Sequence, residues 1–305
     1  MLFEESRKWL KELGLPESDV FELPDSGKRF ADGAHFRTET STVNSPGALE
    51  GLLSRAESLG IVINRVGETY GIFRHRDSEL RDMLSLCREK GVELNLSVGP
   101  RATNDLSATA QSKQGMTIGY RLRGMEQVVR AIEDIRRAVR LGCRGITLYD
   151  EGLLWVLSEL KKRGYLPSEL QLKISAHAGQ ANPAACQLLE RLGADSINPV
   201  RDLDLFMLAA LRRSISAPLD IHVDNPQASG GFLRIYEAPE IVRICAPVNL
   251  KSGNIMVPSH GFRSGKTDGE SMAEQMAVVL EHINRYFPKA VQSPAGSGPA
   301  LPQIP

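Results

Sequence analysis

The sequence predicts a single α/β domain, a (β/α)8 barrel (TIM barrel), with an N-terminal helical lead-in. Two observations carry this prediction. Short apolar runs alternate with amphipathic helical stretches eight times along the chain, and the helical stretches end at a glycine or lead through a proline into the next run. Glycine caps a helix in the left-handed conformation and proline cannot continue one, so these residues mark helix ends. Strands that alternate with helices form a parallel sheet, and eight such units fit a closed barrel of about 250 residues.

The expected elements follow one another in a regular order. The strands are residues 34–39, 61–64, 92–96, 145–149, 170–175, 195–198, 219–223 and 248–251. The helices are residues 49–59, 78–90, 125–141, 153–163, 183–192, 203–214, 238–245 and 270–287. The alternative, an open doubly wound sheet, needs a glycine-rich phosphate-binding turn after its first strand, and none follows Glu39.

This order divides the chain into three parts. We expect residues 1–33 to form an N-terminal helix and lead-in, and residues 34–288 to form the barrel. Residues 289–305 are rich in proline, glycine and serine, and this composition predicts a disordered tail.

Composition excludes several classes of partner. The 305 residues contain 37 Lys and Arg against 37 Asp and Glu, whereas a nucleic-acid surface needs a basic excess, so no nucleic-acid partner is expected. The sequence contains neither an apolar run of about 18 residues, as a membrane span needs, nor the basic start of a secretory signal. We therefore expect a cytoplasmic protein without a membrane partner. The four cysteines have no C-x-x-C spacing, so no iron–sulfur cluster is expected. We expect them to be packing residues.

The strand phase predicts a polar barrel interior. Alternate side chains of a barrel strand face the helices and the interior, and the helix-facing ones should be apolar. The inward set is then Arg37, Glu39, Asn64, Glu93, Asn95, Ser97, Thr147, Tyr149, Gln171, Lys173, Ser175, His177, Asn198, Asp220, His222, Asp224, Asn249 and Lys251. Buried polar groups are costly unless they are paired. Such groups form either an internal ion-pair network or a ligand site, and we expect the early strand positions to be structural and the late ones functional.

The late positions supply the candidate site at the C-terminal mouth of the barrel. The candidate acid/base residues are Glu39, His177, His222 and Asp224. The candidate substrate-binding residues are Arg37, Asn64, Tyr149, Lys173, Arg201, Asn249, Lys251, Ser229 and Gly230. Ser229 and Gly230 lie in a glycine-containing loop after the seventh strand, where backbone N–H groups of many barrels bind anions; an ordinary turn is the alternative.

Two questions about chemistry stay open at this point. His177, His222 and Asp224 have the residue types of a divalent-metal site, and satisfied polar-core histidines are the alternative. Lys173 and Lys251 bind a carboxylate or form a Schiff base, and we favour the binding role. The loop of residues 254–269 is either a lid that brings His260 or Arg263 onto an anionic ligand or a solvated connection. The insertion of residues 99–123 is expected to shape substrate access.

Part of the chain, mainly residues 170–224, resembles the barrel of the U32 peptidase-like family. The resemblance lies in Asn182-Pro183-Ala184-Ala185 opening a helix, in the run 189–194, in Arg201-Asp202-Leu203 where that family has Arg-Glu-Leu, and in the acidic residue of the strand 219–223. It implies a barrel with Arg201 in a C-terminal site. The chain departs from the family where Val223-Asp224-Asn225-Pro226 replaces His-Gly-x-x-Cys, and it lacks the cluster-binding cysteines of hydroxylating members. Neither peptidase activity nor iron–sulfur chemistry therefore follows.

These patterns predict an enzyme that acts on a small, polar, anionic metabolite by acid/base or metal-assisted chemistry, as an isomerase, lyase or hydrolase. The first alternative is a U32-like peptidase or hydrolase, which needs a wide groove at the mouth. The second is a non-catalytic binding subunit, in which every inward charge would be paired internally. A large exposed apolar patch on the first, second or eighth helix would favour a protein partner or a homo-oligomer.

Overall fold

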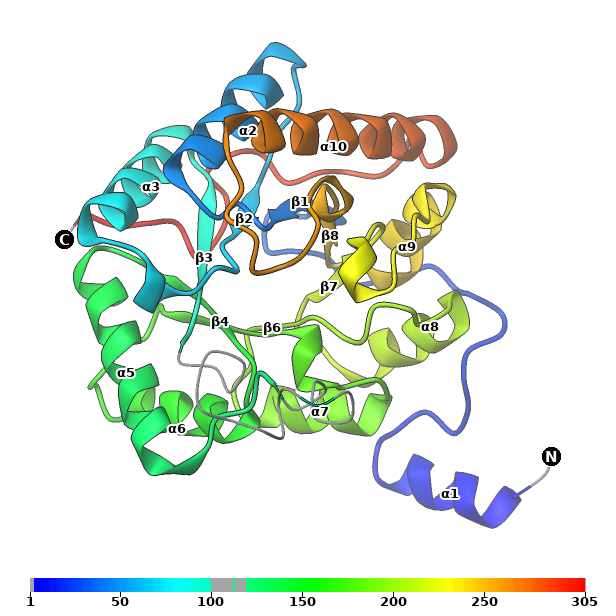
Figure 1. The fold of residues 1–305 in the computed structure, drawn as a ribbon. Coiled ribbons are helices and arrows are strands. Elements are labelled where there is room, and N and C mark those ends of the chain that lie inside the picture. Colours follow the sequence, from blue (N-terminus) through cyan, green and yellow to red (C-terminus); the bar gives the residue numbers. More distant parts are fainter. Residues whose placement is uncertain (1–2, 100–111, 113–118, 305) are drawn as a thin grey trace.

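The computed structural model describes residues 3–99, 112 and 119–304, and these residues form a closed parallel barrel (Figure 1). Its strands are β1 Phe36–Ser41, β2 Arg65–Gly67, β3 Glu93–Ser97, β4 Gly145–Leu148, β5 Gln171–Ile174, β6 Ser196–Ile197, β7 Leu219–His222 and β8 Val248–Lys251. They follow one another around the barrel in sequence order, and β1 pairs with both β2 and β8. The predicted (β/α)8 fold is confirmed.

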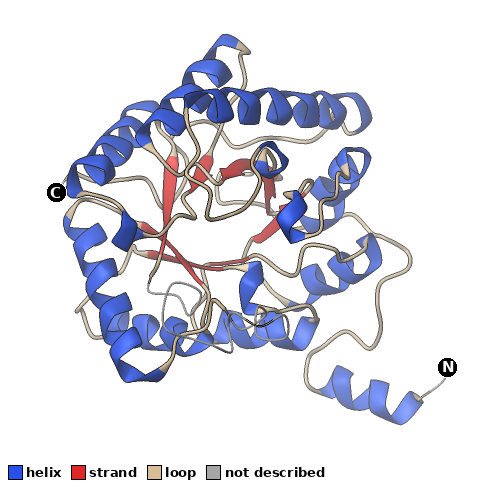
Figure 2. Cartoon of the chain, in the orientation of Figure 1, coloured by secondary structure: helices blue, strands red, loops and turns tan. Residues whose placement is uncertain are grey.

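Helices surround this barrel as an outer ring (Figure 2). They are α2 Pro46–Ser58, α3 Asp77–Lys90, α5 Gly124–Arg140, α6 Glu151–Lys162, α7 Pro183–Arg191, α8 Leu205–Ser214, α9 Ala238–Cys245 and α10 Lys266–Tyr286. Side chains of Ser45, Asp150, Asn182 and Asp204 accept a backbone N–H at the start of α2, α6, α7 and α8. Each of these caps satisfies an N–H group that has no partner within the helix.

The apolar core lies between the barrel and the ring. Strand residues such as Leu94 and Ile146 are fully buried and belong to the same apolar cluster as helix residues such as Leu49 and Leu80. The four cysteines are free and buried in this layer, and burial raises the pKa of Cys143 to about 12. The prediction that the helix-facing phase is apolar is therefore correct, and the thiols pack rather than react.

The second strand begins later than predicted. β2 starts at Arg65, whose partner in the register is Glu39 of β1, so Arg65 rather than Asn64 points inward. The Asn64 amide instead bonds the backbone N–H of Thr38 at 3.0 Å and the backbone carbonyl of Ser293 at 2.9 Å. The apolar run 61–63 leads up to the barrel without pairing, which is why its phase gives the wrong inward residue.

The N-terminal segment begins with the predicted helix, α1 Glu4–Glu12, which stands apart from the ring (Figure 1). None of its residues is buried. The following lead-in contacts the barrel through the buried side chains of Val20 and Phe30. None of the described helices has the length and apolar character that a membrane span needs.

The C-terminal segment is ordered, which corrects the prediction of a disordered tail. It crosses the N-terminal end of the barrel, where Ser293 is 1% and Ala300 is 2% exposed. The Arg37 guanidinium donates to the Ser297 carbonyl at 3.2 Å, and the Glu93 carboxylate accepts the Ala300 N–H at 2.7 Å. A polar segment orders here because the buried charges at this end of the barrel need hydrogen-bond partners.

Candidate functional site

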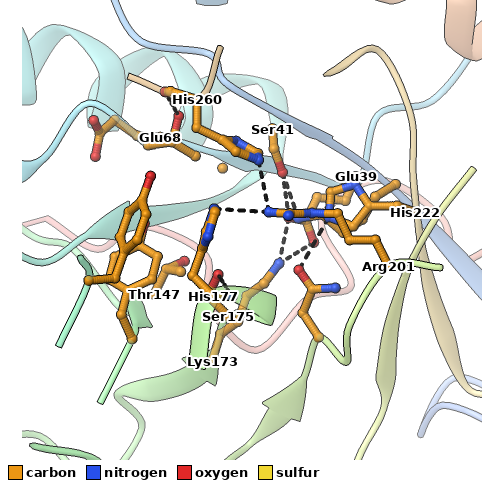
Figure 3. Close-up of a pocket in the computed structure, with 16 residues that line it drawn as sticks. Glu39, Ser41, Glu68, Thr147, Lys173, Ser175, His177, Arg201, His222 and His260 are labelled. Atoms are coloured by element: carbon orange, nitrogen blue, oxygen red, sulfur yellow. Dashed lines mark hydrogen bonds and ion pairs between the residues drawn. The ribbon is translucent and has the colours of Figure 1, made fainter. Parts of the chain in front are cut away.

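A cavity opens at the C-terminal end of the barrel (Figure 3). It encloses about 400 Å³, its opening to solvent included. The side chains around it come from strand ends and from the loops that follow them. They are Glu39, Ser41, Gly67, Glu68, Thr69, Tyr120, Thr147, Tyr149, Lys173, Ser175, His177, Asn198, Arg201, His222, Lys251 and His260.

Glu39 occupies the floor of the cavity and is completely buried. The strand register places it beside Arg65 on one side and Lys251 on the other. Its carboxylate accepts from Arg65 Nε at 2.7 Å and from Lys173 Nζ at 2.5 and 2.7 Å, and it also contacts Lys251 Nζ. Burial alone would raise the pKa of Glu39, but the three cations hold it well below its usual value. Glu39 is therefore ionised.

Asp220 lies one layer below Glu39. It contacts Arg65, lies 3.1 Å from Lys173 Nζ and accepts from Asn249 Nδ2 at 2.6 Å. The network thus sets the cations Arg65, Lys173 and Lys251 against the carboxylates Glu39 and Asp220. The expected internal ion-pair network exists, and it leaves a local excess of positive charge beneath the cavity.

Lys251 differs from Lys173 in its surroundings. Its Nζ contacts Glu39 and donates to Ser41 Oγ at 2.6 Å, whereas Lys173 Nζ lies between the carboxylates of Glu39 and Asp220. Burial lowers the pKa of Lys251 to about 7; Glu39 acts in the opposite direction, and neighbouring Lys173 lowers it further. The Lys251 amine can therefore exchange a proton near neutral pH.

Arg201 reaches the rim of the cavity from the turn that follows β6 (Figure 3). Its Nη2 donates to His177 Nε2 at 3.0 Å and to His260 Nε2 at 2.8 Å. Because a guanidinium cannot accept a hydrogen bond, both imidazoles accept through Nε2 and are neutral in this arrangement. Within the described part of the chain, no carboxylate pairs with Arg201, and its buried Nε has no hydrogen-bond partner. Burial lowers the pKa of Arg201, as expected for a cation held away from water.

Flat rings form one wall of the cavity. His177 belongs to the short 3-10 helix η4 Ala176–Ala178 after β5, and its ring stacks on Tyr120 with centroids 4.0 Å apart. The His260 ring meets His177 edge to face at 5.1 Å. Tyr149 OH lies 2.8 Å from Ser97 Oγ. The wall fixes the two histidines that contact Arg201.

His222 lines the cavity, but both of its ring nitrogens are engaged. Nδ1 accepts from Asn254 Nδ2 at 3.0 Å, and Nε2 lies 3.3 Å from Asn198 Oδ1. Burial, followed by the charges of Lys251 and Arg201, lowers the pKa of His222 well below its usual value. His222 is therefore a neutral, fixed side chain.

Asp224 lies outside the cavity lining and anchors the loop after β8. Its carboxylate accepts from Ser252 Oγ at 2.6 Å, Gly253 N at 2.8 Å and Ile255 N at 3.1 Å. The structure thus does not bring Asp224 together with His177 and His222. The described residues contain no group of three His, Cys, Asp or Glu side chains placed to hold a metal ion. The donor set of the predicted divalent-metal site is not in place.

Three predicted substrate-binding residues lie at the opposite end of the barrel. Arg37, Asn64 and Asn249 contact the C-terminal segment or Asp220. Ser229 and Gly230 form a turn after β7 whose Ser229 carbonyl accepts from Asn225, and they do not line the cavity. These five predicted residues therefore lie outside the cavity lining, since inward phase does not tell which end of the barrel a side chain faces. The remaining predicted residues, namely Glu39, Tyr149, Lys173, His177, Arg201, His222 and Lys251, line the same cavity.

The sequence reasoning overlooked Glu68 and Ser41. Glu68 follows β2, and its carboxylate accepts from Gly71 N at 2.5 Å and Ser97 N at 3.0 Å. With β2 placed at Arg65–Gly67, Glu68 is the first residue after the C-terminal end of the strand, which is where barrel sites lie. Ser41, two residues after Glu39, continues the inward alternation of β1.

The loop of residues 254–269 forms part of the cavity wall. Asn44 Nδ2 donates to the carbonyls of His260 at 3.1 Å and Phe262 at 2.6 Å, which holds the loop against the loop after β1. His260 is 8% exposed and contacts Arg201, whereas Arg263 turns outward to Glu79. Of the insertion at residues 99–123, residues 100–111 and 113–118 lie outside the described residues, and Tyr120 is the described residue that reaches the cavity.

Comparison with known proteins finds structural similarity but no family. No family model and no curated protein matches the sequence. The structure of the U32 peptidase Mk0906 matches with a TM-score of 0.41 and 17% identity, over 69% of this chain and 78% of that chain. The native KDPGal structure matches with a TM-score of 0.48 and 10% identity, over 82% of this chain and 94% of that chain. The homocysteine methyltransferase MmuM from Escherichia coli matches with a TM-score of 0.46 and 11% identity, over 74% of this chain and 83% of that chain. All three TM-scores lie below 0.5, so these similarities assign no reaction to this chain.

Proposed function

We propose that the protein is an enzyme that converts a small, polar, anionic metabolite by proton transfer at the C-terminal mouth of its barrel. The observation that carries this proposal is Arg201, a partly buried guanidinium with a buried Nε, which among the described residues bonds two histidines and no carboxylate. A buried cation is costly unless an anion compensates it. The carboxylate or phosphate of a ligand would supply that anion.

The lining of the cavity suits an anionic ligand. Lys173 and Lys251 at the floor add positive charge, and Tyr149 and Thr147 offer hydroxyl groups. An anionic metabolite would thus meet cations at both the rim and the floor.

Glu39 and Lys251 are the groups best suited to move a proton. Glu39 is ionised and touches Lys251, whose pKa lies near neutral pH. Ser41 lies 2.6 Å from Lys251 Nζ and 3.1 Å from Glu39 Oε1, so its hydroxyl can relay a proton between them. This arrangement favours isomerase or lyase chemistry beside a carbonyl, with hydrolysis as the remaining class.

The alternatives have less support. A U32-like peptidase needs a groove for an extended chain, whereas the floor residues Glu39, Lys173 and Lys251 are at most 4% exposed in a recessed cavity. A purely structural or binding role would fit the paired charges of Glu39 and Asp220, but it leaves Arg201 unexplained. Cytoplasmic location and association into a homo-oligomer stay predictions.

Thermal unfolding with candidate anions tests the proposal. Monocarboxylates, dicarboxylates and sugar phosphates are added to the wild type and to Arg201→Gln, and Arg55→Gln, which removes a guanidinium from a surface pair with Glu274, is the matched control. A ligand at 100 times its Kd should stabilise the wild type and the control by about 2.7 kcal/mol, and Arg201→Gln much less. Equal stabilisation of all three proteins, or of none, would contradict an anion site at Arg201.

A further inference from the structure

We propose that Lys251 forms an imine with the carbonyl carbon of a small oxo acid whose carboxylate is bound by Arg201. This inference rests on the proposed function and names its substrate class. Lys251, Arg201 and Ser41 line the same cavity. Lys251 lies at its floor beside Glu39 and Ser41, and Arg201 contacts His177 and His260 (Figure 3). A molecule with a carbonyl at one end and an anionic group at the other would meet both.

The surroundings select Lys251 over Lys173 as the nucleophile. Lys173 Nζ lies within 3.1 Å of both Glu39 and Asp220, so two carboxylates occupy its donors. Among the described residues, Lys251 Nζ contacts one carboxylate, that of Glu39, which it shares with two other cations, and the hydroxyl of Ser41. A buried lysine next to another cation loses its proton more easily, and the neutral amine is the nucleophile. The lowered pKa of Lys251 agrees with this assignment.

The step balances without an external reagent. The Lys251 ammonium passes one proton to the Glu39 carboxylate, directly or through Ser41, which frees the nitrogen lone pair. The lone pair attacks the carbonyl carbon; a C–N bond forms and the C=O π electrons move to oxygen. A proton then moves from nitrogen to that oxygen, and the Glu39 acid protonates the hydroxyl, which leaves as water. The products are a protonated imine, one water and the original Glu39 carboxylate.

The protonated imine explains why an acid–base site would need this lysine. It withdraws electrons from the carbon next to the former carbonyl, so a C–H or C–C bond at that carbon can break with its electron pair delocalised toward nitrogen. The regenerated Glu39 carboxylate lies beside Lys251 and can accept a proton in that step. Lyase and isomerase reactions both follow from such an intermediate.

Borohydride trapping tests the inference on the full-length protein. Pyruvate is incubated with the protein and sodium borohydride, and the product is analysed by intact mass and peptide mapping. We expect a covalent gain equal to pyruvate minus one water plus two hydrogens, located at Lys251. Lys251→Arg, which keeps the charge, should lose the adduct, and its circular dichroism should show that it folds. Lys90→Met, which removes an exposed lysine paired with Glu57, should keep the adduct.

The carboxylate requirement is tested by comparing ligands. Trapping of pyruvate should exceed that of acetone, which lacks the anionic group, by at least about tenfold, because hydrogen bonds to charged groups are the strong ones. Arg201→Gln should remove this difference. No adduct on the wild type, or adducts located on other lysines, would overturn the imine.

The two proposals fail in distinguishable ways. If anions stabilise the protein through Arg201 and no adduct forms, the proposed anion site stands and the imine is wrong. If Lys251 traps pyruvate and acetone equally, the imine stands and the anion site at Arg201 is wrong.

Discussion

Replacing Glu39 by glutamine should destabilise the barrel strongly. The Glu39 carboxylate is 0% exposed and contacts Arg65, Lys173 and Lys251. Glutamine keeps the shape but removes the charge, so Asp220 alone then faces three buried cations. Breaking a single buried ion pair costs about 3–5 kcal/mol, and a typical domain is stable by only about 5–15 kcal/mol. We expect Glu39→Gln to lose at least the cost of one pair.

Urea unfolding followed by circular dichroism at pH 7 measures this loss. Glu274→Gln is the matched control, because its carboxylate pairs with Arg55 at the surface with both side chains at least 42% exposed. An exposed pair contributes about 0–1 kcal/mol, so the control should unfold almost like the wild type. Adding Lys251→Met to Glu39→Gln removes one uncompensated cation and should recover part of the loss, as expected for coupled neighbours. The reasoning is refuted if Glu39→Gln and Glu274→Gln have the same midpoint.

Three further predictions follow from the same structure. The pKa of Glu39 is lowered from 4.5, so the stability that its carboxylate contributes should be complete above pH 4.5 and should decline as the pH falls below it. The melting temperature of Glu39→Gln should therefore fall less steeply with acid than that of the wild type. Deleting residues 293–305 should expose the N-terminal end of the barrel and lower the melting temperature, whereas an unchanged melting curve would mean that the segment contributes nothing. Gly145→Ala should cost about 1–3 kcal/mol in urea unfolding, because the new Cβ would press against Asn95 Oδ1 and lie 2.8 Å from the Leu94 carbonyl. Gly27→Ala, where nothing lies within 4 Å, is its control.

Strand phase predicted which side chains enter the barrel, but not how deep they lie. Arg37 and Glu39 have the same phase on β1, yet Glu39 lines the cavity while Arg37 bonds the C-terminal segment. Asn249 and Lys251 repeat this pattern on β8. Residues two apart on a strand share a direction and differ by one layer, so a correct phase still mixes the structural end of the barrel with the functional one.

The alternation of residues along the strands could not predict contacts between distant loops. Asp224 lies past the end of β7, where the two-residue period stops, and its carboxylate is taken up by the loop after β8. The contact of His260 with Arg201 joins residues 59 positions apart and depends on how a long loop packs. Helix caps and glycines predicted the fold well because they act locally, whereas these contacts depend on the completed tertiary structure.

The two ends of the barrel together explain why its interior can be so polar. At the N-terminal end, the C-terminal segment covers Arg37 and Glu93 and supplies backbone partners for both. In the middle layer, Glu39 and Asp220 compensate most of the positive charge of the lysines and Arg65. At the C-terminal end, Arg201 has no compensating carboxylate within the described residues. The charges of Arg37, Glu93, Glu39 and Asp220 already have protein partners. An anion that enters the mouth is therefore stabilised most beside Arg201, and its uncharged part then points toward Lys251. The segment that composition marked as disordered thus supplies hydrogen-bond partners to the buried charges at the other end of the barrel.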